Sequence, residues 1–272
     1  MEAIKKVFDD LIDNFVPPEV EDRLQRLDAR LNEFGVDPFG FDPSYVKPAV
    51  PFIRFLYEHW FRVQTFGLSN VPQGRVLLIG NHSGQVPLDA MMTVTAMFME
   101  AEPPRIVRSM IETWVPSLPF ISYLFQRWGQ IVGTRENCLR LLDAEQSILV
   151  FPEGMRGISK PYSKRYQLQD FGLGFMRLAL MSDTPIVPVA IVGAEEQAPQ
   201  LYNARGIAKL FGFPALPLTP TFPLFGPIGL LPYPSRYRIY FGKPMRFSGN
   251  PDDEDWVVGE KVNQGKQTIR RA

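Results

Sequence analysis

The strongest constraint on the fold is an alternation between short apolar runs and helix-like stretches that begins near residue 75. The apolar runs are RVLLIG, RIVRSM, GQIVG, SILVF, PIVPVAIVG and YRIYFG. Several are apolar on both faces, as the strands of a buried sheet are. Helical spacing appears between them, in LDAMMTVTAMFME, RENCLRLLDAEQ and GLGFMRLALMSD. The alternation predicts an α/β domain with a largely parallel sheet flanked by helices, and ligands at the carboxyl ends of its strands.

The chain before this domain has a different pattern and is predicted to be an N-terminal helical region, residues 1–66. Two amphipathic segments are expected, with apolar faces formed by Ile4, Val7, Phe8, Leu11, Ile12 and Phe15, and by Val20, Leu24, Leu27, Leu31 and Phe34. A third, aromatic segment spans 51–67. Its polar stripe of Arg54, Glu58 and Arg62 favours a position on a surface, of the domain or of a membrane. Residues 67–248 then form the main domain, and 249–272 a short charged tail.

The composition narrows the class of protein and its compartment. The chain has 29 basic and 29 acidic residues, so it lacks the basic footprint of a nucleic-acid-binding protein. The single cysteine, Cys138, lies on an apolar helical face, which favours a place in the core and suits a reducing compartment. The first residues are too charged for a signal peptide. We therefore expect a cytoplasmic location.

The segment LLIGNHSGQVPLDAMM, residues 77–92, places one of only two histidines directly after an apolar strand. Asp89 follows His82 by seven residues, in the first turn of the next predicted helix. In one interpretation Asp89 only caps the N-terminus of the helix, where a carboxylate is favourable, and His82 is an ordinary loop histidine whose hydrogen bonds are satisfied. In the other, the loop 83–86 bulges, Asp89 accepts a hydrogen bond from one ring nitrogen of His82, and the other nitrogen removes a proton from a hydroxyl.

Three further blocks follow in the chain. GQIVGTR ends a strand with Arg135, LVFPEGMRG carries Glu153, Gly154 and Arg156, and PIVPVA carries Pro188. Together with His82 and Asp89, and in this order, the blocks resemble those of the glycerolipid acyltransferase superfamily, which includes lysophosphatidic acid acyltransferases. The resemblance covers about residues 65–248. The resemblance implies that the main domain has the α/β fold of this superfamily.

The resemblance also implies roles for the motif residues. His82 would be the general base and Asp89 its orienting partner, and the substrate would be bound by Ser83, Gly84, Arg135, Glu153, Gly154 and Arg156. Two departures stand out: six residues separate His82 from Asp89 where the family usually has four, and Met155 replaces the usual threonine. The longer spacing is similar to that of a bacterial subgroup of lysophospholipid acyltransferase-like proteins.

The reaction expected from these residues is transfer of a fatty acyl group from acyl-CoA or an acyl-carrier protein to a lysophospholipid hydroxyl. Such a transfer needs a base for the alcohol proton and cations for a phosphate, and no serine-nucleophile elbow occurs in the sequence. No bound cofactor and no metal site are expected, since the two histidines and one cysteine are dispersed. Two alternatives are a non-catalytic lipid-binding protein on the same scaffold and an acyltransferase for a non-phosphorylated lipid alcohol.

A charge-free stretch, residues 210–235, suggests contact with a membrane. It is long enough to cross a bilayer as a helix, but its seven prolines forbid that helix. We therefore expect a peripheral membrane protein, and the alternative is a packed proline-rich connection. Candidates to enter the headgroup boundary are Phe211, Phe213, Phe222, Phe225, Leu230 and Leu231, or Phe55, Trp60 and Phe61. Lys160, Lys164 and Arg165 form either a positive patch beyond Arg156 or a solvated loop.

Overall fold

The computed structural model describes residues 16–117, 121–204, 206, 208 and 216–271, so the first predicted helix lies outside the described residues. Its centre is a seven-stranded sheet in the order β1-β9-β6-β2-β5-β3-β4. The strands are β1 (Gln64–Phe66), β2 (Val76–Gly80), β3 (Val107–Ile111), β4 (Ile131–Val132), β5 (Ser147–Val150), β6 (Ile186–Val192) and β9 (Arg238–Phe241). Neighbours pair in parallel except β6 and β9, which are antiparallel. The predicted, largely parallel sheet is confirmed.

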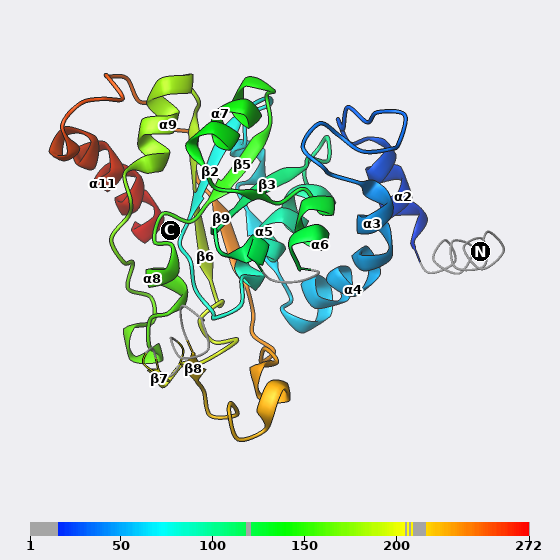
Figure 1. Ribbon diagram of the computed structural model, residues 1–272, viewed down its shortest axis with the longest axis vertical. Helices are drawn as coiled ribbons and strands as arrows, with labels where there is room; N and C mark the ends of the chain where they lie inside the picture. The colour runs from blue at the N-terminus through cyan, green and yellow to red at the C-terminus, as the bar shows by residue number, and fades with distance from the viewer. Residues whose placement is uncertain (1–15, 118–120, 205, 207, 209–215, 272) are drawn as a thin grey trace.

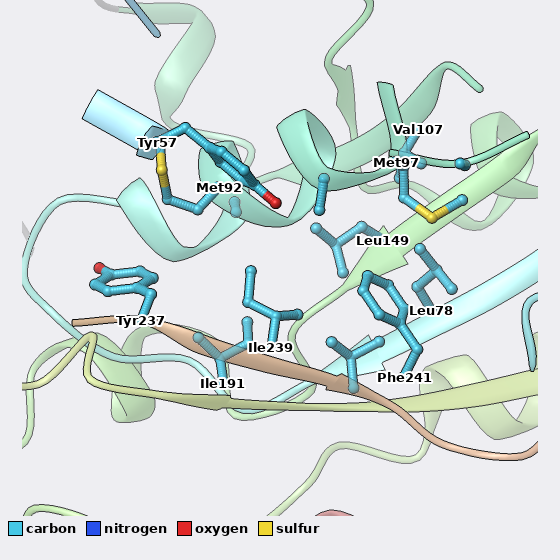
Figure 2. Packing of buried hydrophobic residues seen from close by; sticks show 14 of the residues in the cluster. Tyr57, Leu78, Met92, Met97, Val107, Leu149, Ile191, Tyr237, Ile239 and Phe241 are labelled. Atoms are coloured by element: carbon cyan, nitrogen blue, oxygen red, sulfur yellow. The ribbon is translucent and has the colours of Figure 1, made fainter. Parts of the chain in front are cut away.

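The sheet is buried on both faces, as the continuous apolar runs of its central strands require. In β2, Val76 and Leu78 belong to one core cluster, whereas Leu77 and Ile79 belong to the other. Figure 2 shows the first cluster, in which side chains of the helix after β2 lie over Leu78 and Leu149 of the sheet. The alternation follows from the two-residue period of a strand.

Helices cover each face of the sheet (Figure 1). One face packs against α5 (Leu88–Met99), with Met92 and Met97 fully buried, and against residues 56–61. The other packs against α7 (Arg135–Asp143), α9 (Gly174–Ser182) and α11 (Asp255–Arg271). Cys138 is buried there on α7, where burial raises the pKa of its thiol to about 11.

The C-terminal segment that was expected to be a charged tail is helix α11. Val258, Val262 and Ile269 lie on one face of this helix and are buried against the sheet. Their spacing of four and seven residues keeps them on the same side, and the charged residues point outward. The tail is therefore a packed part of the domain.

The N-terminal region packs beside this domain and is less helical than the apolar pattern predicts. It contains α2 (Pro18–Gln25), α3 (Pro43–Val46), a 3-10 turn (Lys47–Ala49), α4 (Val50–Phe55) and a π-helical turn (Leu56–Trp60). Helix α2 ends before Leu31 and Phe34, which are 43% and 80% exposed. The Asn32 carboxamide accepts the backbone N–H groups of Phe34 and Val36, and so stabilises a turn in place of the helix.

Short elements complete the chain. They are the 3-10 turns Leu68–Asn70, Val115–Ser117, Tyr162–Lys164 and Gly226–Leu230, helices α6 (Ile121–Arg127) and α8 (Met155–Ile158), and the antiparallel pair β7 (Tyr202–Asn203) and β8 (Pro217–Leu218). Within the ranges described, none of the helices combines the length and apolar character that crossing a membrane requires.

Candidate active site

The candidate site begins where the chain leaves the sheet after β2. Asn81 follows that strand, and its side chain accepts from the backbone N–H of Ile191 (2.7 Å) and donates to the Ile191 carbonyl (2.8 Å). The two bonds occupy the backbone groups of β6 beside the end of β2. His82 therefore starts a loop at the carboxyl edge of the sheet, where ligands bind in open α/β folds.

His82 and Asp89 are in contact, and we call this pair the dyad. His82 Nδ1 lies 2.7 Å from Asp89 Oδ2, and the same oxygen accepts the backbone N–H of Ser83 at 2.9 Å. Helix α5 begins only at Leu88, so the residues between the pair form the bulged loop that this contact requires. With a carboxylate as its partner, Nδ1 carries the proton and Nε2 is the basic nitrogen.

The imidazole is also fixed by packing. The Phe151 ring stacks on it, with ring centroids 4.2 Å apart and planes 13° apart. Gly157 lies behind the residue, where an added Cβ would be 2.6 Å from the His82 carbonyl oxygen. The His82 side chain is 12% exposed and that of Asp89 is fully buried. The ring therefore has one orientation and a small accessible surface.

Glu153, which the resemblance assigns to substrate binding, holds the backbone of the site. It is 1% exposed, and its two oxygens accept the backbone N–H groups of His82 (2.9 Å) and Gln169 (2.6 Å). Burial raises its pKa, and the two backbone N–H groups oppose that shift. We therefore interpret Glu153 as a residue that positions His82.

The two glycine positions, Gly154 and Gly84, have backbone reasons for their identity. Gly154 has φ +53° and ψ −143°, a region that side chains avoid, at the start of α8. Gly84 has φ +87° in the bulged loop. Ser83 is buried beside them, and its hydroxyl has no hydrogen-bond partner in the described part of the chain.

The two predicted phosphate-binding arginines differ in their relation to the dyad. Arg156 is exposed on α8, next to the glycine that packs on His82, and its guanidinium donates to the Asp170 carbonyl at 3.0 Å. Arg135 Nη2 lies 3.0 Å from Met181 Sδ, near the end of α9. Arg135 begins α7 soon after β4, at the same carboxyl edge of the parallel sheet as His82, but its guanidinium contacts the end of α9 that leads into β6. Among the described residues, no hydrogen bond or ion pair joins Arg135 to His82 or Asp89.

The expected basic patch is smaller than its sequence suggests. Lys160 is 6% exposed, pairs with Glu195 at 2.5 Å and donates to the Gln167 carbonyl at 3.2 Å. Burial raises the pKa of Glu195, and the lysine opposes that shift. Lys160 therefore has a structural role, and Lys164 and Arg165 are left on the surface.

The dyad lies within a segment that matches a known family. The model of the Acyltransferase family matches residues 62–192. An uncharacterised protein of Mycobacterium leprae is 39% identical over 245 residues, which cover 88% of this chain and 67% of that one. A probable 1-acyl-sn-glycerol-3-phosphate acyltransferase of Mycoplasma pneumoniae is 29% identical over 148 residues, covering 52% and 53% of the two chains. The chain belongs to the glycerolipid acyltransferase superfamily.

A solved acyltransferase has the same fold. The crystal structure of the 1-acyl-sn-glycerophosphate acyltransferase PlsC from Thermotoga maritima aligns with a TM-score of 0.52, over 84% of this chain and 79% of that one. The sequence identity is 13%, so the likeness concerns the fold. The fold class and the family predicted from the sequence are both confirmed.

Proposed function

We propose that this acyltransferase moves a fatty acyl group from a thioester, acyl-CoA or an acyl-carrier protein, to the hydroxyl of a lysophospholipid, with His82 as the base. The observation that carries the proposal is the 2.7 Å contact between His82 Nδ1 and Asp89, which leaves Nε2 basic. A lipid-binding protein without turnover would not need this arrangement.

The proposed reaction balances around Nε2. His82 Nε2 takes the hydroxyl proton while the acceptor oxygen attacks the thioester carbonyl. The tetrahedral intermediate then collapses, breaks the carbon–sulfur bond and expels the thiolate, which receives the proton from the imidazolium. Asp89 accepts from Nδ1 throughout and stabilises the imidazolium. An assay of acyl transfer to a panel of lysolipids and neutral lipid alcohols tests the reaction, and binding without transfer to any of them would contradict it.

We assign the acceptor phosphate to Arg156, because it lies on the short helix that packs against His82. Arg156→Lys should raise the apparent KM for a lysophospholipid about tenfold or more, since one ammonium cannot replace a planar fork that holds two oxygens. Arg135→Lys is the matched control and should leave this KM unchanged. Saturation curves for both variants measure the difference. An unchanged KM in Arg156→Lys would point to an acceptor without a phosphate.

We further propose that the protein works at a membrane surface through an apolar tip, residues 224–231. The tip lies at the lower end of Figure 1, beyond the sheet and beside β7 and β8. Its exposed side chains are Leu224 (81%), Phe225 (66%), Ile228 (71%), Leu230 (39%) and Leu231 (65%). A contiguous apolar surface without a charge is typical of a site that contacts a lipid or a protein. Because the proposed lysophospholipid acceptor resides in a membrane, we infer that the partner of the tip is lipid and not another protein.

The other candidates for membrane contact are less suitable. Phe61 is fully buried and packs against Tyr237, with ring centroids 4.8 Å apart, so the expectation for this residue is wrong. Trp60 is half-buried, and its indole N–H donates to the Pro232 carbonyl at 3.2 Å. Phe55 is 49% exposed, Phe222 is half-buried, and Phe211 and Phe213 lie outside the described residues.

Replacing Phe225 and Ile228 together with serine should lower binding to neutral phosphatidylcholine vesicles about tenfold or more, because two exposed apolar side chains no longer enter the headgroup boundary. Co-sedimentation with the vesicles measures the binding, which should persist in high salt since the tip carries no charge. Trp256→Ser on α11 is the matched control, because this residue is 68% exposed outside the tip. Equal loss in the control, or no vesicle binding by the unchanged protein, would contradict the proposal.

A further inference from the structure

The loop that separates His82 from Asp89 is held from outside by a buried glutamine. Gln197 Nε2 donates to the carbonyl oxygens of Gly84 (2.8 Å) and Val86 (3.2 Å). Gln197 is 1% exposed and follows β6, the neighbour of β2 in the sheet. The strand order thus places the loop after β6 beside the loop after β2. Both bonds fall within the six-residue segment between His82 and Asp89.

Gln197 is itself fixed on its other side. Its Oε1 accepts the Tyr237 hydroxyl at 2.6 Å, and its backbone carbonyl accepts the N–H of Tyr233 at 2.7 Å. Tyr237 is fully buried at one end of the first core cluster (Figure 2). Burial, and then the charge of Asp89, raise the pKa of Tyr237, so its hydroxyl remains a donor. The acceptor oxygen of the amide is therefore occupied, and its N–H₂ group has to face the loop.

The loop is shaped for this contact. A side chain at Gly84 would overlap the Gln197 amide and the Ala194 carbonyl. Gly84 also has φ +87°, and the next residue, Gln85, has φ +50°. Two successive left-handed residues turn the loop carbonyls toward Gln197. An unsupported loop with this backbone would be strained, and the two amide bonds offset that strain.

We propose that Gln197 is a positioning residue that holds the bulged loop so that Asp89 reaches His82. The inference rests on the proposed function of the dyad. The backbone N–H of His82 is fixed by Glu153, and Asp89 is fixed in the first turn of α5. The segment between them forms the bulged loop, and the hydrogen bonds from Gln197 to the Gly84 and Val86 carbonyls fix the backbone path of this loop. A change of about 1 Å in this course is enough to break a hydrogen bond of 2.7 Å.

The test is Gln197→Met, which keeps the length of the side chain and removes the amide. The value of kcat should fall about 10- to 100-fold while KM for the acyl donor stays within about twofold, because the base is misplaced and the binding surface is retained. Gln146→Met is the matched control. Its amide bonds Arg108 and the Ala144 carbonyl before β5, at the opposite edge of the sheet. The control should lower stability without lowering kcat.

A spectroscopic readout separates positioning from general stability. The chain has two histidines, so ¹⁵N-histidine labelling in a His59→Ala background leaves one imidazole, that of His82. The parent protein should show Nδ1 protonated and Nε2 bare, and Gln197→Met should show a mixture of the two tautomers. Unchanged imidazole signals in Gln197→Met would overturn the proposal, whatever its activity.

Two further results distinguish a failure of the positioning role from a folding defect and from a failure of the proposed function. If Gln197→Met does not fold, Tyr237→Phe removes only the hydroxyl that holds Oε1 and should give a smaller change of tautomer in the same direction. No change in that variant would overturn the proposal. If the parent protein transfers no acyl group to any acceptor while Gln197→Met still changes the tautomer, the positioning role is supported and the proposed function fails.

Discussion

Replacing His82 with alanine should lower kcat for acyl transfer about 10²- to 10⁴-fold, which is the usual contribution of a positioned base. The other partners of the Asp89 carboxylate in the described structure are the backbone N–H groups of Ser83 and Ala90, which are donors and cannot take the hydroxyl proton in place of His82. Folding should be nearly intact, because His82 lies in a loop and its backbone N–H still donates to Glu153. Initial rates at saturating acceptor measure the effect, and thermal unfolding checks the fold.

The matched control is the other histidine. His59→Ala removes a ring that is 66% exposed and stacks on Phe55 at a centroid distance of 5.6 Å. Its kcat should equal that of the unchanged protein. Full acyl transfer by purified His82→Ala protein would exclude His82 as the base and show that another group supplies the turnover.

The strands β2, β3, β4, β5, β6 and β9 were predictable, because each lies in one of the mostly apolar runs of the sequence. Strand β1 was not predictable in this way. Gln64, Thr65 and Phe66 form an edge strand of three residues whose partner, β9, lies far along the chain. Such a strand depends on a tertiary contact more than on its own sequence. Helix α11 could have been predicted from the helical spacing of Val258, Val262 and Ile269, but the charged residues between them led us to expect an unpacked tail.

The motif residues of the site were predictable, and their roles were less so. Glu153 was named as a substrate contact, but its burial and its two backbone partners depend on where Gln169 lies in space. Gln197 belongs to no motif that we identified, and it meets its loop partner Gly84 across 113 residues. Its one signal is its place shortly after a buried parallel strand. Polar residues at the ends of such strands therefore merit as much attention as the motifs.

The last prediction concerns Asp89→Asn, which should lower kcat about 10²- to 10⁴-fold by changing the tautomer of His82. Asp89 Oδ2 accepts from both His82 Nδ1 and the Ser83 N–H, and Oδ1 accepts the Ala90 N–H. An asparagine has one oxygen, so its N–H₂ group must face one of these donors. Where it faces His82, Nδ1 becomes the acceptor and the proton moves to Nε2, which then no longer acts as a base.

The control for this change is Asp42→Asn, because Asp42 is also a buried carboxylate at a helix N-terminus. It accepts the Ser44 N–H at 3.0 Å and pairs with Arg127 at 3.4 Å. Both variants should lose stability, about 1–3 kcal/mol for a buried partner left unsatisfied. Only Asp89→Asn should lose turnover, with a protonated Nε2 in its imidazole spectrum. A protonated Nδ1 in that variant, together with full activity, would show that the His82 tautomer is set by something other than Asp89.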